Sequence, residues 1–379
     1  MARSNGDLYR KFQAFYHENV QMNREETKIN KNVVRNVVEK IIGHVNGQDS
    51  RFQKEPEGVG SFYSLTKVSQ ANEFDYSILY DTDIVQSWRH VNQPAFYTMD
   101  AVKKIIVSSQ YPLEILPLEY TLRSQYKGPY NVTKRGCLVP LKVKRHFREL
   151  VCNAIDYWTK KPKPDERIEI ENLSDSPAVT FTVKQRDGND LDVDMAPMIN
   201  VQLPFKDDFR WPKNGAKWPS PEKVQQIESM GVNLVTSDPL YWKLSFAICE
   251  KELLVDIDKK GSCRRRSLRI MKSLRELIWC PGDEAENPYG LTSYHLKNIL
   301  FLECERLPMD WQWEMELLDI RIIGMCNQLL DHLSKKHLQQ YFNRSMNLFE
   351  NKVDRTLNRA ARKLNKFLHC PEEHLERFL

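Results

Sequence analysis

The spacing of apolar residues changes along this chain, and the change limits the folds that it can adopt. The first 46 residues have helical spacing: Asn23 followed by Glu26 fits a helix start, and an apolar stripe runs from Val33 to Ile42. Between about residues 57 and 200, short runs separated by Gly, Pro, Asn and Asp predict strands around one helix. From Pro221 onward, long amphipathic stretches predict helices.

These patterns predict an α+β fold in two lobes. The expected strands are residues 74–80, 114–123, 178–184 and 191–201, with a helix at 143–157. The later helical stretches are residues 240–257, 267–278, 293–305, 310–335 and 352–367. We expect a mixed lobe over residues 1–205, which includes the long N-terminal helix, and a helical lobe over residues 206–379. A cleft between two lobes is a common place for a ligand site.

Composition narrows the class of protein. The 379 residues are 41% hydrophobic, which is enough for a substantial core, and the net charge of +5 permits an anionic partner without demanding one. No two of the eight cysteines form a C-x-x-C pair. The start MARSNGDLYR lacks the apolar centre of a signal peptide, and no apolar run reaches membrane-spanning length. We therefore expect a soluble, cytoplasmic protein with reduced thiols and no membrane partner.

A glycine-rich turn, Gly58-Val59-Gly60-Ser61, precedes the first expected strand. Backbone N–H groups at such a turn can hold phosphate oxygens, and a serine hydroxyl adds one more donor. Gly-x-Gly-Ser occurs in many loops, so an ordinary turn is the commoner explanation of the motif by itself.

Two acidic patterns lie on expected strands. Glu73 and Asp75 are two residues apart and project from one face, as do Asp190, Asp192 and Asp194. One of these three aspartates could meet the first pair from a neighbouring strand. Three such carboxylates suit Mg²⁺ or Mn²⁺, and two ions can clamp both oxygens of an in-line displacement at phosphorus. Alone, Glu-x-Asp more often marks a polar strand end in solvent.

These motifs carry a resemblance to a known family. The segment GSFYSLTKVSQANEFDYSIL closely resembles the active-site segment of cyclic GMP-AMP synthase (cGAS) and its animal relatives, the cGAS-like receptors. Further stretches agree in type and order: LDVDMAPMI, YWKLSFAICEKELL with SLRIMKSLRELI, TSYHLKNILFLECE and QQYFNRSMNLFENK. The resemblance extends from about residue 57 to the C-terminus, with a looser match in the N-terminal helix. It implies a bilobal nucleotidyltransferase fold with a spine helix and an active site in the cleft.

The resemblance also implies roles for individual residues. Glu73, Asp75 and Asp194 would bind two Mg²⁺ or Mn²⁺ ions, and Asp194 would help to activate the attacking ribose hydroxyl. Asp192 has no fixed counterpart in the family and is left out. The substrates, ATP and GTP, would contact Gly60, Ser61, Lys243, Ser245, Lys272, Ser293 and Tyr294.

Within this nucleotide-binding set, Gly60, Ser61 and Lys272 would hold the triphosphate, and the Tyr294 ring would stack on a base. Lys243 stands where vertebrate cGAS carries a base-reading arginine. A lysine cannot make the planar two-pronged contact of an arginine, so the bases and linkage of the product stay open.

A second departure concerns the activating ligand. Vertebrate cGAS inserts a zinc knuckle of one histidine and three cysteines after the segment that matches AICEKELL, whereas this chain has only DKKGSCRRR there. One cysteine cannot make a tetrahedral zinc site, so we expect no zinc. In the family fold this basic loop lies beside the N-terminal helix, on the face that binds duplex nucleic acid. The predicted patch consists of Lys28, Lys31, Arg35, Lys259, Lys260, Arg264, Arg265 and Arg266.

Such a patch would neutralise phosphates without reading sequence. Loss of the DNA-associated knuckle favours double-stranded RNA, which is recognised largely by shape and backbone, although double-stranded DNA stays possible. The alternative is a merely solvated run of charges.

The resemblance therefore implies an innate immune, antiviral sensor. On binding double-stranded RNA, with a possible ligand-induced dimer, it would make a cyclic dinucleotide such as cyclic GMP-AMP from ATP and/or GTP. The product would activate a STING-like receptor. Two alternatives remain. One is a non-catalytic scaffold or developmental member of the fold, which often lacks a full carboxylate set. The other is a nucleotidyltransferase that extends RNA ends, which lacks the SYHLK and LSF-x-x-x-EKE segments found here.

Overall fold

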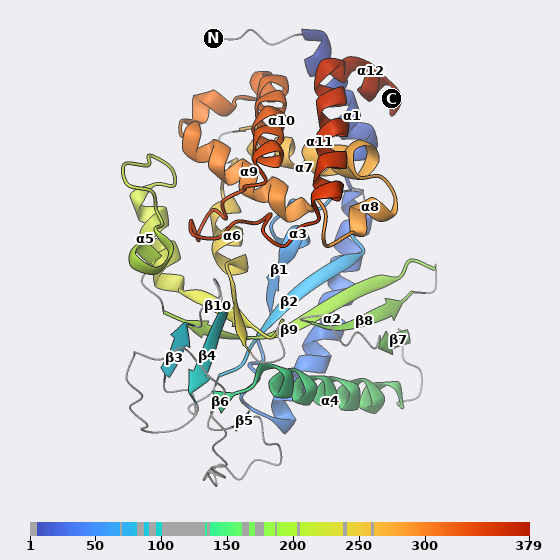
Figure 1. The fold of residues 1–379 in the computed structure, drawn as a ribbon. Helices are drawn as coiled ribbons and strands as arrows, with labels where there is room; N and C mark the ends of the chain where they lie inside the picture. The colour runs from blue at the N-terminus through green and yellow to red at the C-terminus, as the bar shows by residue number, and fades with distance from the viewer. Residues whose placement is uncertain are drawn as a thin grey trace.

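A mixed sheet and a group of helices meet across the middle of the molecule in the computed structural model (Figure 1). The structure describes residues 6–68, 70–81, 87–90, 96–100, 133–134, 137–160, 167–170, 178–185, 188–202, 205–237, 241–258 and 261–379. The expected strand at residues 114–123 lies outside these ranges. The α+β class predicted from the sequence is confirmed.

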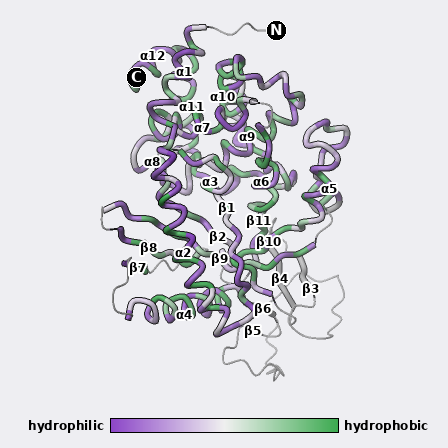
Figure 2. The backbone as a smooth tube through the Cα atoms, turned by 180° about the vertical axis from the view of Figure 1, so that it is seen from behind, coloured by the Kyte–Doolittle hydropathy of each residue, from purple (hydrophilic) through white to green (hydrophobic). Residues whose placement is uncertain are grey.

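The chain begins with two helices, α1 (Gly6–Asn19) and α2 (Arg24–Gln48). Asn23 caps α2 as predicted: its side-chain oxygen accepts hydrogen bonds from the backbone N–H groups of Glu25 and Glu26. The apolar stripe of α2 is buried and the helix packs against α4 (Pro140–Thr159). In the view from behind, α2 shows hydrophilic stretches on its outer side (Figure 2). The helix α2 therefore lies along the back of the molecule, with its apolar side packed against the rest of the protein.

The sheet is built around β9, which pairs with β2 along one edge and with β8 and β10 along the other. The pairing of β2 with β9 is parallel, and the other described pairs are antiparallel. The strands are β1 (Glu57–Val59), β2 (Glu73–Leu79), β3 (Ser87–His90), β4 (Phe96–Asp100), β5 (Thr133–Lys134), β6 (Cys137–Leu138), β7 (Arg167–Ile170), β8 (Val179–Lys184), β9 (Leu191–Val201), β10 (Val232–Val235) and β11 (Trp242–Ser245).

Residues 240–257 were expected to be one helical stretch, and this expectation was wrong at its start. Trp242–Ser245 forms β11, which pairs with β10 on one side and β4 on the other. Only Ala247–Leu254 is helical, as α6. Both β10 and β11 follow residue 205 in the chain yet belong to the sheet. The division of the chain at residue 205 stays a prediction.

The helical part contains one large hydrophobic core that continues into the sheet. α1 packs against α7, α10 and α12, so both ends of the chain lie together at the top of Figure 1. None of the described helices is both long and apolar enough to cross a membrane. The remaining α-helices are α3 (Gly60–Tyr63), α5 (Pro221–Met230), α7 (Arg264–Leu274), α8 (Asp283–Glu286), α9 (Ser293–Arg306), α10 (Leu318–Lys335), α11 (Asp354–His369) and α12 (Pro371–Glu376).

Candidate functional site

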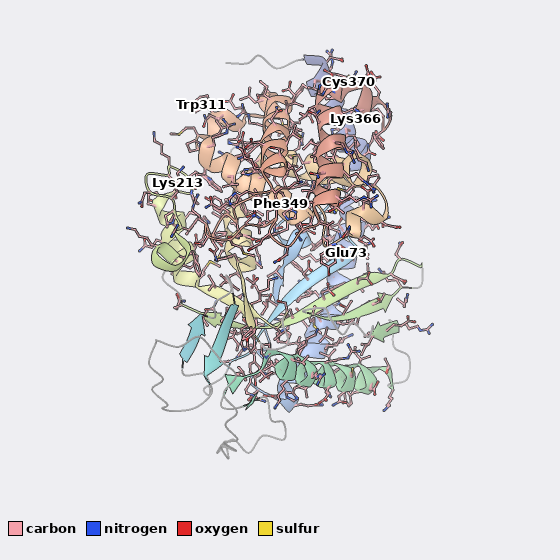
Figure 3. The ribbon with its side chains drawn as sticks, viewed as in Figure 1. Glu73, Lys213, Trp311, Phe349, Lys366 and Cys370 are labelled. Atoms are coloured by element: carbon pink, nitrogen blue, oxygen red, sulfur yellow. The ribbon has the colours of Figure 1, made fainter. Side chains whose placement is uncertain are left out.

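The predicted carboxylates lie side by side on two paired strands. The parallel register of β2 with β9 places Glu73 opposite Asp192 and Asp75 opposite Asp194. Residues two apart on a strand share a face, and residues in register on neighbouring strands do too, so the four acids project together. Figure 3 shows Glu73 where the sheet meets the helical part. The sheet therefore brings together the three acids that the sequence singled out, with Asp192 beside them.

Three of these four carboxylates, Glu73, Asp192 and Asp194, each have a polar side-chain partner. Thr180 donates a hydrogen bond to Asp194 Oδ1 at 2.5 Å, and Lys67 forms an ion pair with Glu73. Thr182, which lies on β8 as Thr180 does, donates a hydrogen bond to Asp192 Oδ1 at 2.8 Å. Neither Lys67 nor these threonines were among the predicted site residues. The period-two pattern of β8 would have placed the threonines on the acidic face if its register had been known.

Burial and, after it, the neighbouring negative charges raise the pKa of Asp75. Burial raises its pKa to about 6, and the neighbouring charges of Asp194 and Glu73 add to the effect. Burial also raises the pKa of Asp194, although the hydrogen bond from Thr180 opposes this. The ionised cluster is therefore held at a cost in free energy that a cation would offset.

Gly60 connects the glycine-rich turn to the same carboxylates. It begins α3 with φ of +73°, and a Cβ atom added to it would lie 1.9 Å from Asp75 Oδ2. Only glycine tolerates both the backbone angle and this approach. The turn is thus seated directly on the acidic face, with Ser61 following as the next residue of α3.

A divalent ion needs several oxygen ligands that converge on one point. Over the described residues, no group of three His, Cys, Asp or Glu side chains is placed to hold a metal ion as it stands. Glu73 is turned toward Lys67 and Asp194 toward Thr180, so the oxygens do not converge. The donor chemistry nevertheless fits Mg²⁺ or Mn²⁺, because three carboxylates on one face supply hard oxygen ligands and carry the unfavourable charge described above.

Two cavities are lined by six of the seven predicted nucleotide-binding residues, all except Gly60. The first, which we call the carboxylate-side cavity, measures about 480 Å³, and Glu73, Ser61, Lys272 and Ser293 line it. The second, the tyrosine-side cavity, measures about 530 Å³, and its lining includes Lys243, Ser245, Glu250, Tyr294 and Lys297. The structure therefore groups the predicted triphosphate contacts apart from the predicted base contacts.

Lys272 is a buried cation of the carboxylate-side cavity. Its Nζ donates a hydrogen bond to the backbone oxygen of Thr66 at 2.8 Å. Burial lowers its pKa to about 7, and the positive charge of Lys297 contributes. An anion in this cavity would favour the charged form of the lysine.

Tyr294 is fixed through its hydroxyl in the tyrosine-side cavity. The hydroxyl donates to Glu250 Oε1 at 2.8 Å and accepts from Gln340 Nε2 at 3.1 Å. Lys297 lies 5.5 Å from the centre of the ring and pairs with Glu250 at 2.8 Å. Sequence reasoning missed Glu250 and Lys297. Tyr294 and Lys297 are three residues apart on α9, and this spacing could have predicted that their side chains are neighbours.

The predicted basic patch is only partly at the surface. Lys28, Lys31 and Arg35 are exposed on α2, whereas Lys259 and Lys260 lie outside the described residues. Of the expected basic loop, Arg264, Arg265 and Arg266 instead form the first turn of α7.

Arg264 is buried rather than exposed, which corrects the expectation of a free charge there. It pairs with Asp310 at 3.1 Å and lies over the Trp313 ring at 5.3 Å. The guanidinium group of Arg264 is therefore surrounded by other protein groups and is not part of an exposed surface.

The next two arginines are also engaged with the protein. Arg265 donates to the backbone oxygen of Leu254 and lies 3.7 Å from Asp258. Arg266 donates to Gln13 at 2.7 Å and lies 4.3 Å from the centre of the Tyr16 ring. Both side chains are half-buried.

Known proteins share this arrangement of domains. Residues 62–256 match the Mab-21 protein nucleotidyltransferase domain, and residues 263–366 match the Mab-21 protein HhH/H2TH-like domain. The chain belongs to the Mab-21 family. The two matched regions together contain the acidic face, the whole lining of the tyrosine-side cavity, the lining of the carboxylate-side cavity except Ser61, and α11 as far as Lys366.

Among curated relatives, this Mab-21 family chain is 31% identical to protein mab-21-like 3 of Danio rerio over 248 residues, 64% of the chain and 60% of the relative. It is 28% identical to protein mab-21-like 3 of Xenopus laevis, over 64% of the chain and 62% of the relative. It is 27% identical to protein mab-21-like of Drosophila melanogaster, over 62% of each. The matched region spans about 60% of the length of these relatives.

Proposed function

We propose that this Mab-21 family chain is a metal-dependent nucleotidyltransferase that, on binding double-stranded nucleic acid, joins ATP and/or GTP into a cyclic dinucleotide. The observation that supports it most is the parallel register of β2 with β9. That register sets Asp75 beside Asp194 on the face that carries Gly60. Together with the sequence resemblance, it favours a cGAS-like enzyme whose product, such as cyclic GMP-AMP, activates a STING-like receptor.

Each group of residues has a role in this proposal. The backbone N–H groups at Gly60 and Ser61 would bind triphosphate oxygens with Lys272, which lines the same cavity as Ser61. Glu73, Asp75 and Asp194 would hold Mg²⁺ or Mn²⁺, which when bound neutralises charge on the phosphoryl group.

Asp194 is the proposed proton acceptor for the attacking ribose hydroxyl. Its Oδ1 accepts the hydrogen bond from Thr180, which leaves Oδ2 for the hydroxyl. A pKa raised by burial makes this carboxylate a better base than an exposed aspartate.

Base binding belongs to the tyrosine-side cavity in this proposal. The Tyr294 ring, oriented by its bonds to Glu250 and Gln340, would stack on a purine. Lys243 and Ser245 line the same cavity and would contact base edges. Ser293 lines the carboxylate-side cavity and would contact the sugar or phosphates.

The activating ligand in this proposal is double-stranded RNA, bound along the exposed face of α2. Lys28, Lys31 and Arg35 recur on that helix at spacings of three and four residues, which suits a line of phosphates. Arg264 is left out because it is buried. The proposal places the protein in the cytoplasm, with a ligand-induced dimer as one form of the active state.

The test is product analysis. The chain would be incubated with ATP and GTP, with Mg²⁺ or Mn²⁺, and with double-stranded RNA, double-stranded DNA or no ligand. Mass spectrometry should find a phosphatase-resistant cyclic dinucleotide, and Asp75→Asn should abolish it. Unchanged synthesis by Asp75→Asn, or no product under any condition, contradicts the proposal. Activation by duplex DNA alone contradicts the RNA assignment, and a ladder of extended RNA indicates an RNA-end nucleotidyltransferase.

A non-catalytic scaffold or developmental function is the second candidate. The observation that favours it is that the carboxylate oxygens do not converge, since Glu73 pairs with Lys67 and Asp194 bonds to Thr180. If nucleotide binding persists without any product across the same panel, this candidate is preferred.

A further inference from the structure

The outward side of α11 carries a row of positive charge. Arg359, Arg362, Lys363 and Lys366 recur at helical spacing and therefore share one side of the helix. The opposite side is buried in the core through Leu357, Ala360, Leu364 and Phe367. We call the four cations together with Glu284 the α11 site. The core-facing residues fix the helix, so the cations are held in a defined row.

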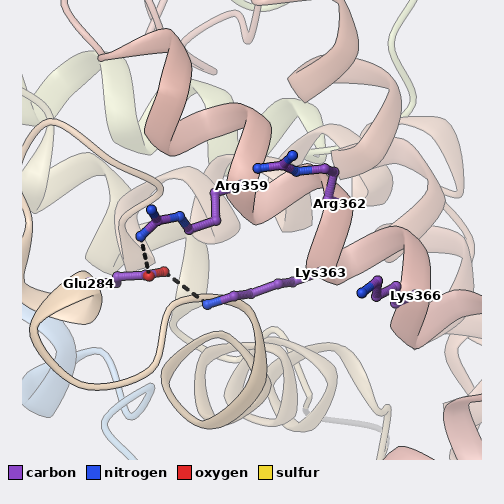
Figure 4. A pocket seen from close by; sticks show the side chains of 5 residues that line it. All are labelled: Glu284, Arg359, Arg362, Lys363 and Lys366. Carbon is purple, nitrogen blue, oxygen red and sulfur yellow. Dashed lines mark hydrogen bonds and ion pairs between the residues drawn. The ribbon is translucent and has the colours of Figure 1, made fainter.

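The α11 site is a shallow hollow that is open to solvent. Its five residues line a cavity of about 430 Å³ (Figure 4). Glu284 reaches in from α8 and accepts hydrogen bonds from Arg359 at 2.8 Å and from Lys363 at 3.1 Å. Arg362 and Lys366 form no ion pair with any other residue in the described ranges.

One carboxylate cannot balance this charge. Among the described residues that line the cavity, Glu284 is the one acid beside four cations, so the lining carries an excess of three positive charges. The favourable interaction of a cation with the carboxyl end of a helix explains Lys366, which lies in the last turn. It does not explain Arg359 and Arg362, which lie further from that end. Like charges spaced by three and four residues repel one another, so the cluster is costly without an anion.

We propose that the α11 site binds a small molecule with adjacent phosphate groups, distinct from a substrate in the two cavities described above. Arginine guanidinium groups bind phosphate oxygens in two-pronged fashion, and lysines add point charges. A hollow of about 430 Å³ has the size of a small-molecule site. Glu284 is then an internal counterion that the ligand displaces.

Glu284 also links the α11 site to the carboxylate-side cavity. Its neighbours Ala285 and Glu286 line that cavity, and Arg275 donates a hydrogen bond to the backbone oxygen of Ala285. A phosphate probe could therefore bind in either cavity, and the experiment must separate the two.

The experiment is calorimetric titration of the full chain with inorganic tripolyphosphate and, separately, with inositol hexakisphosphate. Arg362→Glu with Lys366→Glu should weaken binding at least tenfold, since both residues are exposed and their positive charges become negative without disturbing the core. Lys213→Glu with Lys217→Glu is the matched control, because it changes net charge equally at exposed positions. Lys213 and Lys366 lie on opposite sides of the view in Figure 3. The control should bind as the wild type does.

Two further variants test the details of the site. Glu284→Gln should tighten binding several-fold, because the competing carboxylate is removed. Lys67→Ala, which alters the carboxylate-side cavity, should leave this binding unchanged. Thermal melts of all variants establish that each is folded.

The proposal fails if the α11 variant binds as tightly as the wild type or if the Lys213 and Lys217 control weakens binding equally. It also fails if Glu284→Gln weakens binding, or if Lys67→Ala removes the binding that the α11 variant retains. Binding of a short RNA duplex through Arg362 and Lys366, with no affinity for either phosphate probe, would overturn it in favour of a nucleic-acid surface. These readouts need no nucleotide turnover, so they stand apart from the proposed synthase activity.

Discussion

Replacing Asp75 by asparagine should stabilise the folded protein at neutral pH even as it removes the proposed activity. The pKa of Asp75 is raised from 3.8 in the unfolded chain to about 6 in the folded protein. An ionised Asp75 therefore destabilises the fold. The cost is absent below the unfolded pKa, grows as the pH rises through the interval between the two values, and is complete above the folded pKa. Asparagine carries no charge and avoids this cost.

The magnitude follows from the difference in pKa. Each pH unit corresponds to about 1.4 kcal/mol, so a difference of about two units gives an upper limit of ~3 kcal/mol at pH 7.5. At pH 4.5 the folded protein carries a protonated Asp75 and the limit falls to ~1 kcal/mol. Solvent screening of a partly exposed side chain reduces both figures, so we expect a gain of about 1–3 kcal/mol at pH 7.5.

The assay is urea unfolding of the wild type and Asp75→Asn at both pH values, without divalent ions. Asp156→Asn on the exposed side of α4 is the control and should change stability by less than about 0.5 kcal/mol at either pH. The reasoning is refuted if Asp75→Asn is no more stable than the wild type at pH 7.5, or if its gain is as large at pH 4.5.

Three further substitutions test other parts of the structure. Gly60→Ala should cost about 1–2 kcal/mol of stability through its positive φ and should abolish synthesis by pushing against Asp75; wild-type activity would contradict the close approach. Arg264→Ala should destabilise the protein by about 2–3 kcal/mol in urea unfolding, because it removes a buried side chain and the donor to the buried carbonyl oxygen of Ile257, and a neutral effect would argue against its burial. Lys31→Ala with Arg35→Ala should leave the melting temperature unchanged. It should reduce the salt dependence of duplex RNA binding by about two phosphate contacts, and an unchanged slope would remove α2 from the interface.

Several elements of the fold could be predicted from patterns among residues that are close together in the sequence. The helix start at Asn23 was predictable because the cap is formed by residues two and three positions away. The strand β9 was predictable because apolar and polar residues alternate along it in the sequence. β11 was not, because Trp242–Ser245 is only four residues long and is specified by strands on both sides of it.

The candidate site was harder to predict, because it is formed by contacts between residues that are distant in the sequence. The sequence showed acids on two strands but not their register, so the choice of Asp194 over Asp192 came from the resemblance. The burial of Arg264 was not predictable, because it depends on Asp310 and Trp313, which are distant in the chain. The roles of these residues in catalysis and nucleotide binding stay predictions.

The parallel pairing of β2 with β9 has an evolutionary consequence. The acids of the two strands are placed by a backbone ladder, so the connection between them can change in length without moving the carboxylates. A slip of one residue in that ladder, in contrast, would turn the acids of one strand to the opposite face. Related chains are therefore free to gain or lose residues between the strands, where new specificity can arise, provided that the pairing of Asp75 with Asp194 is kept.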